Sequence, residues 1–290
     1  MRILVTGCNG QVGYLLKELL TNQVELLALT RKELDITNKK LLNNAISNFK
    51  PDIVINAAAY TAVDKAENEE KLAFSINRDG PEYLAKAADK VNASLIHIST
   101  DYVFEGSKSG EYLETDPVNP QCVYGKSKLA GENAVIKYCQ KHIILRTAWV
   151  FGEHGNNFVK TMLRLGKEKS ELGIVSDQFG GPTYAGDIAK AIIDIVKKIE
   201  SCEPVRWGVY HYSGTPQVSW YDFADNIFTK AKQKNILEKT PKLSAISTEE
   251  FPTPAKRPEN SKLDCKSIEA EFGIVPSDWK IELNNIKNYN

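Results

Sequence analysis

The sequence is poor in the residues that build disulfide frameworks and metal centres. It has four histidines, and its five cysteines lie far apart at Cys8, Cys122, Cys139, Cys202 and Cys265. The thiols are odd in number and form no Cys-x-x-Cys pair, a pattern that excludes a disulfide scaffold and the common zinc motifs. The sequence therefore predicts reduced thiols and no zinc site, and it leaves any other metal open.

Excess charge and long apolar runs are also lacking. Lys plus Arg and Asp plus Glu number 37 each, so no net charge draws the chain toward nucleic acid or an anionic membrane. No apolar run approaches the roughly 18 residues that a membrane-spanning helix needs. Residues 1–7 become polar and glycine-rich too early for a signal peptide. We therefore expect a soluble cytoplasmic protein.

An apolar run at the amino terminus leads directly into a glycine-rich turn. Ile3-Leu4-Val5 is followed by Gly7, Gly10 and Gly13, and apolar residues then recur at helical spacing. A strand, a glycine turn and a helix in this order are typical of the phosphate-binding start of a dinucleotide fold. Gly7 would permit the turn, Gly10 the approach of backbone N–H groups to a pyrophosphate, and Gly13 close packing of helix on strand. A glycine turn without a ligand is the alternative. The residues assigned here to the cofactor are Gly7, Asn9, Gly10, Gln11 and Val12.

The second predicted strand, residues 24–29, is followed by a basic pair. Thr30-Arg31-Lys32 precedes the first acidic residue, Glu33. NAD sites usually carry an acidic residue at this point, whereas an arginine suits the 2′-phosphate of NADP. Arg31 therefore favours NADPH, with NADH as the alternative cofactor and an ordinary surface arginine as the competing interpretation. Asp35 and Ile36 would either cap the next helix or lie against the adenine.

Two further buried strands end in small and polar residues. Residues 52–56 lead into Ala57-Ala58-Ala59, where a flat cofactor could lie on the backbone, although packing alone also explains the alanines. Residues 94–99 form a strand that ends at Thr100. Ligands of open α/β sheets bind outside the carboxyl ends of the strands, which is where Thr100 would present its hydroxyl. His97, inside this strand, is expected to be a satisfied buried histidine.

Tyr124 and Lys128 are four residues apart in a predicted helix, residues 124–138, and so share one helix face. A nearby ammonium group stabilises a phenolate and lowers the pKa of a phenol, which is ordinarily about 10. A chain with 12 tyrosines and this many lysines holds about one Tyr-x-x-x-Lys pair by chance, so an ordinary exposed pair is the alternative. The repeated strand–helix units before the pair favour a site in which Thr100, Tyr124 and Lys128 move a proton on or off an oxygen.

The strand–helix alternation continues through about residue 150 and includes a strand at residues 142–146. This pattern predicts an α/β fold with a Rossmann-like, doubly wound parallel sheet. Residues 1–150 would form the NAD(P)-binding domain, with about 185–200 returning to it. Residues 151–290 would form mainly a small, discontinuous C-terminal substrate lobe.

Longer motifs carry a resemblance that covers nearly the whole chain. They are Asn56–Ala59, Thr61–Glu67, Ser99–Phe104, Tyr124–Glu132, Arg146–Val150, Gly155–Phe158, Asp177–Thr183 and Arg257–Ser261. With these motifs the chain resembles the extended short-chain dehydrogenase/reductase superfamily and, within it, the dTDP-4-dehydrorhamnose reductases. The first motifs are general to the superfamily, and the later ones are more specific to these reductases.

The resemblance implies a catalytic triad of Thr100, Tyr124 and Lys128, and substrate contacts from Thr61, Val63, Thr100, Tyr124, Trp149 and Arg257. An indole face can pack on the apolar face of a hexose, although a core tryptophan at a strand end is the alternative for Trp149. Arg257 would face a nucleotide diphosphate through two hydrogen bonds.

The reaction that the resemblance implies is reduction of dTDP-4-dehydro-6-deoxy-L-mannose to dTDP-L-rhamnose. NADPH would supply hydride to C4, Tyr124 would protonate the oxygen, Lys128 would hold the nicotinamide ribose and lower the pKa of Tyr124, and Thr100 would orient the carbonyl. The substrate would be a dTDP-linked 4-keto-6-deoxy sugar, and a homodimer is one open arrangement.

Three alternatives remain. A sugar-nucleotide dehydratase would carry Glu after Thr100-Asp101, where this chain has Tyr102. A reductase of another nucleotide-linked 4-keto sugar would share the triad. A non-catalytic NADP-binding regulatory subunit, resembling the methionine adenosyltransferase β subunit, would bind cofactor without turnover.

Overall fold

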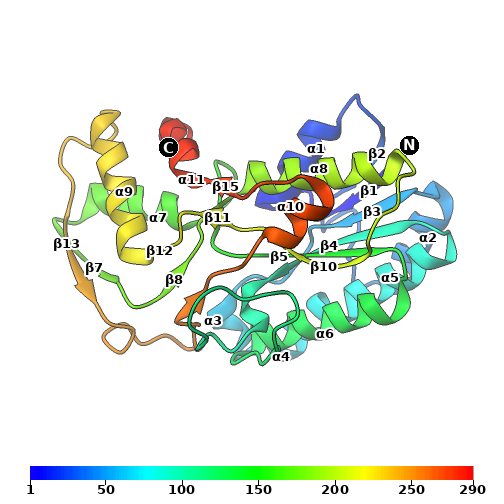
Figure 1. Ribbon diagram of the computed structural model, residues 1–290, viewed down its shortest axis with the longest axis horizontal. Helices are drawn as coiled ribbons and strands as arrows, with labels where there is room; N and C mark the ends of the chain where they lie inside the picture. Colours follow the sequence, from blue (N-terminus) through cyan, green and yellow to red (C-terminus); the bar gives the residue numbers. More distant parts are fainter. Residues whose placement is uncertain (290) are drawn as a thin grey trace.

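The computed structural model describes residues 1–289 and is built around a six-stranded parallel sheet (Figure 1). The strand order is β10-β5-β4-β3-β1-β2. The bounds are Arg2–Thr6 (β1), Glu25–Leu29 (β2), Ile53–Asn56 (β3), Ser94–Thr100 (β4), His142–Thr147 (β5) and Gly208–His211 (β10). β1 pairs with the edge strand β2 on one side and with β3 on the other, so the strand order reverses direction at β1.

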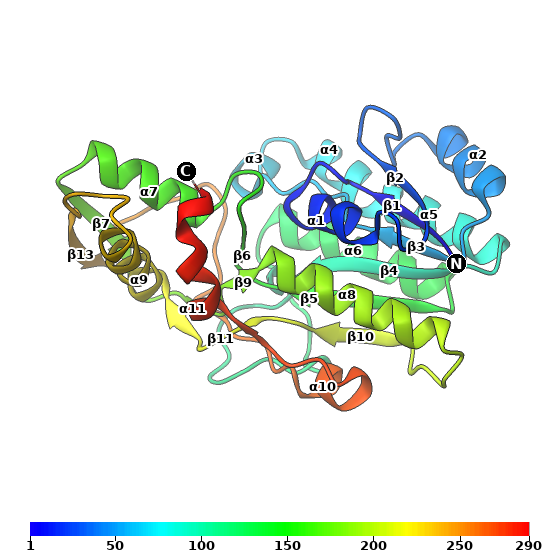
Figure 2. The same ribbon diagram turned by 90° about the horizontal axis from the view of Figure 1, so that it is seen from above.

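Helices cover both faces of this sheet, which is why apolar residues dominate its central strands. The helices α1 (Gln11–Leu20) and α8 (Ala185–Glu200) pack on one face. The helices α2 (Lys39–Phe49), α5 (Gly80–Lys90) and α6 (Val123–Tyr138) pack on the other. Figures 1 and 2 show the two layers, with α1 and α8 side by side across the sheet from α6. The α/β fold is confirmed, and α8 packs on the sheet beside α1.

Short helices join β3 to α5 on the second face. They are α3 (Val63–Ala66), α4 (Glu70–Phe74) and the π-helix η1 (Ser75–Asp79), and the 3₁₀ turn η2 (Asp101–Val103) follows β4. The helical region between β3 and β4 passes through Gly80-Pro81. Pro81 lacks a backbone N–H, and the chain widens into the π-turn η1 just before it rather than ending the helix.

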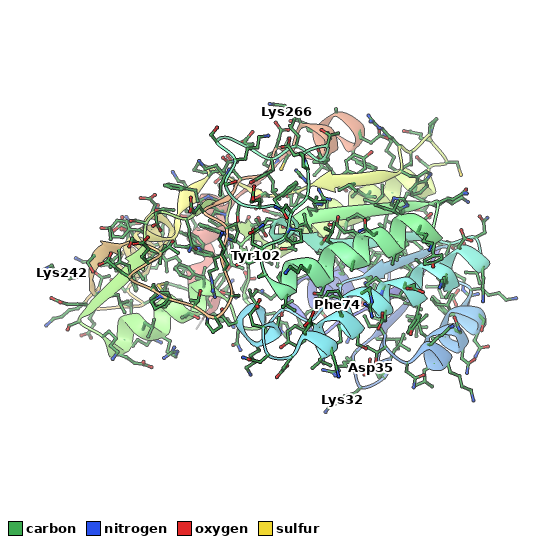
Figure 3. All side chains as sticks on the ribbon, turned by 90° about the horizontal axis from the view of Figure 1, so that it is seen from below. Lys32, Asp35, Phe74, Tyr102, Lys242 and Lys266 are labelled. Carbon is green, nitrogen blue, oxygen red and sulfur yellow. The ribbon has the colours of Figure 1, made fainter. Side chains whose placement is uncertain are left out.

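The second half of the chain forms a smaller lobe with a core of its own. Its larger elements are α7 (Phe158–Glu168), β7 (Glu171–Val175), α9 (Trp220–Gln233), β13 (Lys242–Ile246), α11 (Trp279–Glu282) and the 3₁₀ segment η3 (Leu283–Tyr289). β7 pairs with β13, and α7 packs on α9. Ser219 begins α9 with a reciprocal capping box to Asp222, the helix start that its sequence favours. Figure 3 places Tyr102 between the sheet and Lys242, which lies at the far end of the lobe.

Short strands link the lobe to the sheet. They are β6 (Val150–Phe151) with β9 (Thr183–Tyr184), β12 (Val218–Ser219) with β8 (Phe179–Gly180) and β14 (Asn260–Ser261), and β11 (Gly214–Thr215) with β15 (Ser277–Asp278). The carboxyl half also returns to the sheet, through β10 and through α10 (Lys266–Phe272), which packs near α8. The sequence assigned only α8 to this return. The division into two domains itself stays a prediction.

Candidate active site

The glycine turn after β1 leaves the first turn of α1 open. Gly7 has φ +74°, and a Cβ on Gly13 would collide with the carbonyl oxygen of Gly7, so both positions exclude larger residues. Gly10 is the N-cap of α1, with no side-chain cap and no acidic residue in the first turn. The backbone N–H groups at this end of α1 therefore face outward as an anion-binding terminus.

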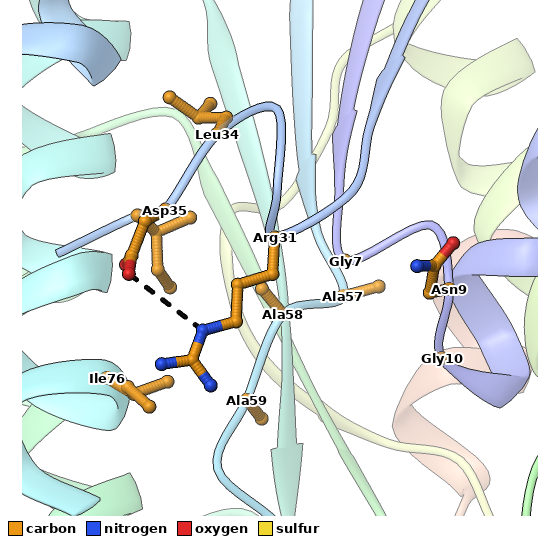
Figure 4. A pocket seen from close by; sticks show the side chains of 11 residues that line it. Gly7, Asn9, Gly10, Arg31, Leu34, Asp35, Ala57, Ala58, Ala59 and Ile76 are labelled. Carbon is orange, nitrogen blue, oxygen red and sulfur yellow. Dashed lines mark ion pairs between the residues drawn. The ribbon is translucent and has the colours of Figure 1, made fainter. Parts of the chain in front are cut away.

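A cavity of about 260 Å³ lies beside this turn (Figure 4). Its lining includes the predicted cofactor residues Gly7, Asn9, Gly10, Arg31, Asp35, Ile36, Ala57, Ala58 and Ala59. The Nε atom of Arg31 lies 3.8 Å from the Asp35 carboxylate, and the arginine side chain is 70% exposed. The side chain can therefore reorient toward a ligand in the cavity.

The two acidic residues after β2 are engaged locally. Glu33 accepts hydrogen bonds from the backbone N–H and the hydroxyl of Thr30, which hold the pKa of its carboxyl below the ordinary value. Asp35 accepts from the N–H and hydroxyl of Thr37. The suggestion that Asp35 caps α2 is wrong, because Asn38 occupies the N-cap and accepts from the Leu41 N–H. Asp35 lies in the cavity wall, and the other interpretation, that it lies against the adenine of the cofactor, stays a prediction.

A second cavity of about 550 Å³ adjoins the first. Asn9, Gly10, Ala57 and Ala59 line both. The predicted residues that line the second cavity are Asn9, Gly10, Gln11, Val12, Ala57, Ala59, Thr61, Val63, Thr100, Tyr124, Lys128 and Trp149. Cofactor and substrate residues proposed from the sequence thus meet in one continuous wall at the carboxyl edge of the sheet.

Thr100 ends β4 and begins η2. Its hydroxyl donates to Asp101 Oδ1 at 2.9 Å and accepts from the Tyr102 N–H at 3.2 Å. Asp101 is buried and also accepts from the Ser261 hydroxyl at 2.5 Å. Burial raises the pKa of Asp101 to about 6, against the opposing effect of these hydrogen bonds. Asp101, which also lines the cavity, therefore holds the Thr100 hydroxyl in place.

Tyr124 lies in the first turn of α6, with its ring edge-to-face against Tyr102 at 5.4 Å. Burial raises the pKa of the Tyr124 phenol above its ordinary value, while a hydrogen bond with Thr100 acts in the opposite direction. The sequence led us to expect a pKa lowered by Lys128. The pKa of Tyr124 instead rises, because burial of the phenol is the largest cause of the shift.

Lys128 lies one turn further along α6 and is 2% exposed. Its Nζ donates to the carbonyl oxygen of Ile98 at 2.7 Å and lies 3.5 Å from Nε2 of His97. Burial lowers the pKa of Lys128 to about 8, although the Glu132 carboxylate favours the charged form. His97 is fully buried and partnered, as expected from the sequence.

Trp149 forms the wall toward the lobe. It adopts φ +49°, and its indole stacks on that of Trp220 at 3.5 Å and 9°. Gly180 makes room for it, since a Cβ there would lie 2.6 Å from the indole. The stack covers one face of Trp149 while the residue lines the second cavity.

Arg257 is not among the residues that line this cavity. It makes two hydrogen bonds to the Asp64 carboxylate, at 2.9 and 2.8 Å, beside the start of α3. Arg257 instead lines a groove of about 450 Å³ in the lobe, together with Phe158, Trp220 and Phe251. The structure therefore brings the other predicted residues together and leaves Arg257 at the neighbouring groove.

Several residues at the site were not singled out from the sequence. Thr147 is paired in register with Thr100 across β4 and β5 and lines the second cavity. Asp101 and Trp220 support Thr100 and Trp149. Thr147 could have been identified from the sequence, because it ends the strand next to the one that ends at Thr100. No local sequence signal indicates that Trp220 stacks on Trp149.

The described residues supply neither a metal cluster nor a membrane span. Within residues 1–289, no group of three or more His, Cys, Asp or Glu side chains is arranged to hold a metal ion. No helix in that range has the length and hydropathy to cross a bilayer.

Comparison with known proteins gives consistent matches over the full chain. The family model described as the RmlD substrate binding domain matches residues 1–289. A dTDP-4-dehydrorhamnose reductase of Aggregatibacter actinomycetemcomitans is 54% identical over 290 residues, covering 99% of each chain. The crystal structure of a dTDP-4-dehydrorhamnose reductase from Clostridium acetobutylicum is 42% identical, with a TM-score of 0.92 and 99% of each chain covered. That of the Bacillus anthracis reductase in complex with NADP is 38% identical, with a TM-score of 0.91, covering 100% of this chain and 99% of that one.

Proposed function

The chain belongs to the family defined by the RmlD substrate binding domain, and from this premise we propose that it is an NADPH-dependent oxidoreductase that reduces dTDP-4-dehydro-6-deoxy-L-mannose to dTDP-L-rhamnose. The observation that carries the proposal is the convergence of Thr100, Tyr124 and Lys128 on one cavity, which adjoins the groove at the glycine turn. The 54% identity to a dTDP-4-dehydrorhamnose reductase supports the choice of substrate.

The groove at the glycine turn has the features that NADPH requires. The uncapped end of α1 suits a pyrophosphate, and the alanines after β3 leave room for a flat group against the backbone. Arg31 faces the same cavity and suits a 2′-phosphate, while Glu33 is turned to Thr30. Hydride for C4 of the sugar is the chemistry that NADPH supplies when bound.

Tyr124 donates the proton that completes the reduction. As the C4 carbonyl gains hydride, its oxygen becomes an alkoxide that takes the phenolic proton and yields the C4 hydroxyl. The raised pKa of Tyr124 keeps the phenol protonated at neutral pH, the form that a proton donor needs. Thr100, fixed by Asp101, orients the carbonyl oxygen beside the phenol.

Lys128 and the lobe position the two ligands. Lys128 holds the nicotinamide ribose from a site fixed by the Ile98 carbonyl. Trp149, supported by Trp220, packs on the hexose. The apolar groove beyond the stack takes the nucleoside, and Arg257 at its edge takes the diphosphate, exchanging its Asp64 contact for phosphate oxygens.

The test is oxidation of NADPH, followed by absorbance, with enzymatically generated dTDP-4-dehydro-6-deoxy-L-mannose as substrate. Saturable oxidation that depends on this sugar nucleotide is expected, with an epimeric 4-keto sugar nucleotide as the matched control. Equal or faster turnover of the epimer would assign the chain to another keto sugar. NADPH binding without turnover of either, together with binding to a partner synthetase, would assign it a regulatory role.

A further inference from the structure

A row of polar side chains crosses the apolar core beneath Lys128. Thr6, Asn56 and His97 are register partners on β1, β3 and β4, so their side chains lie on the same face of the sheet. They are 0%, 1% and 0% exposed. This face is the one that α6 covers, and the row ends at Lys128 Nζ, 3.5 Å from Nε2 of His97.

The orientation of Asn56 in this row is fixed by its neighbours. Its Oδ1 accepts from the Thr6 hydroxyl at 2.7 Å and from the backbone N–H of Ala58 at 3.2 Å. A backbone N–H can only donate, so the atom of Asn56 that faces it must be the oxygen. The amide nitrogen of Asn56 therefore faces Nδ1 of His97, 2.9 Å away.

This orientation determines the tautomer of His97. The Asn56 amide N–H donates to Nδ1, so Nδ1 carries no proton and the neutral ring carries its proton on Nε2. Burial holds the pKa of His97 well below its ordinary value, and the nearby Lys128 acts in the same direction. The Nε2–H group is thus directed at Lys128 Nζ.

From this geometry we propose that His97 is a positioning residue for the reductase, because its Nε2–H disfavours the charged form of Lys128 and fixes Nζ against the Ile98 carbonyl. The proposal rests on the role of Lys128 in the proposed function. A neutral amine can accept from His97 Nε2–H while donating to Ile98, whereas an ammonium group has no lone pair to accept with. Burial acts in the same direction, and the Glu132 carboxylate on α6 opposes both. Asn56 and Thr6 thereby act on a cofactor-binding lysine through the core of the sheet.

The first test determines the tautomer of His97 and does not depend on catalytic activity. Long-range ¹H–¹⁵N spectra of the cofactor-free protein, labelled at its four histidines, distinguish Nε2–H from Nδ1–H rings. His97 is expected as the Nε2–H tautomer throughout pH 6–9. His142 is the internal reference for the opposite tautomer, because its Nδ1 faces the Cys139 carbonyl at 2.6 Å. An Nδ1–H ring or an imidazolium at His97 would overturn the proposal.

Two substitutions at position 97 distinguish the effect of the Nε2–H donor from the effect of the packing of the ring in the core. In His97→Asn, the amide oxygen replaces Nδ1 toward Asn56 and no donor reaches Lys128. In His97→Gln, the amide N–H replaces Nε2–H. The pKa of Lys128 can be measured from the pH dependence of NADPH affinity and of kcat/KM. It should rise by about one unit in His97→Asn and remain near the wild-type value in His97→Gln. His142→Asn is the control.

Asn56→Asp tests the same contact by changing the hydrogen-bond partner of His97 Nδ1. A carboxylate only accepts, so it forces Nδ1 to carry the proton and turns a lone pair toward Lys128. The spectrum of His97 should change to that of the Nδ1–H tautomer, and the pKa of Lys128 should again rise. Equal behaviour of His97→Asn and His97→Gln, or a downward shift in either His97→Asn or Asn56→Asp, would refute the role. If the wild type lacked reductase turnover, the proposed function would fail, while the spectra and NADPH affinities would still test this contact.

Discussion

Replacing Glu132 by glutamine tests how the buried ion pair behind the site supports it. Glu132 and Arg146 have side chains 1% and 5% exposed and form two short contacts, Nε–Oε1 at 3.0 Å and Nη2–Oε2 at 2.7 Å. Ser99, next to Thr100, also donates to Glu132 at 2.5 Å. The carboxylate therefore connects α6 to the ends of β4 and β5.

The magnitude follows from the charge that the substitution leaves behind. Removing one partner of a buried ion pair costs about 3–5 kcal/mol, because the other charge stays desolvated and unpaired. Glutamine keeps one acceptor for Arg146, so we expect about 3 kcal/mol. With an unfolding entropy of about 2.1 cal/mol/K per residue over 290 residues, this loss lowers Tm by about 5 °C.

Thermal unfolding of the cofactor-free variant measures this loss. Glu168→Gln is the matched control, since Glu168 pairs with Arg164 on the exposed face of α7, where the two side chains are 49% and 60% exposed. An exposed pair contributes about 0.5 kcal/mol or less, so the control should melt within about 1 °C of the wild type. The same Glu132→Gln variant should lower the pKa of Lys128, because the carboxylate favours its charged form. A Glu132→Gln variant that melts with the control would refute the reasoning.

Three further substitutions test the proposed roles. Tyr124→Phe should reduce turnover by about 10²–10⁴-fold with near-normal NADPH affinity, measured by steady-state kinetics and titration; full activity would remove Tyr124 as the acid. Lys128→Met should weaken both NADPH binding and rate. Burial lowers the pKa of Lys128 to about 8, so as the pH rises the folded state loses this proton before the unfolded state does. The unfolding free energy of the wild type, relative to that of Lys128→Met, should therefore rise between about pH 8 and 10. A difference that does not change with pH would contradict the lowered pKa. Arg31→Ala should lower the preference for NADPH over NADH by about tenfold, with Lys32→Ala as control, and an unaltered ratio would show that Arg31 reads no phosphate.

The parts of the site that follow local rules could be predicted from the sequence. Thr100 was placed by the end of a buried strand, and Tyr124 and Lys128 by their spacing on one helix face. The glycine turn was recognised from a strand running into Gly7, and its packing role follows from the absence of Cβ atoms. These features depend on residues close together in the chain, where periodicity is informative.

The parts that depend on tertiary packing could not be predicted in this way. The pKa of Tyr124 rises because of burial, which no spacing rule reports. Arg257 meets Asp64 across 193 residues of sequence, and its pairing there keeps it at the neighbouring groove. The row from Asn56 to His97 depends on the register between β3 and β4, so the sequence indicated a buried histidine without its partners.

The most direct test of the account follows deuterium from the nicotinamide into the product sugar. The enzyme would be given NADPH that carries deuterium at the transferable position of C4, together with dTDP-4-dehydro-6-deoxy-L-mannose, and the product would be analysed by NMR. The expected product is dTDP-L-rhamnose with deuterium at C4 of the sugar. Deuterium at another carbon, the C4-epimeric sugar, or unlabelled starting material with intact NADPH would contradict it.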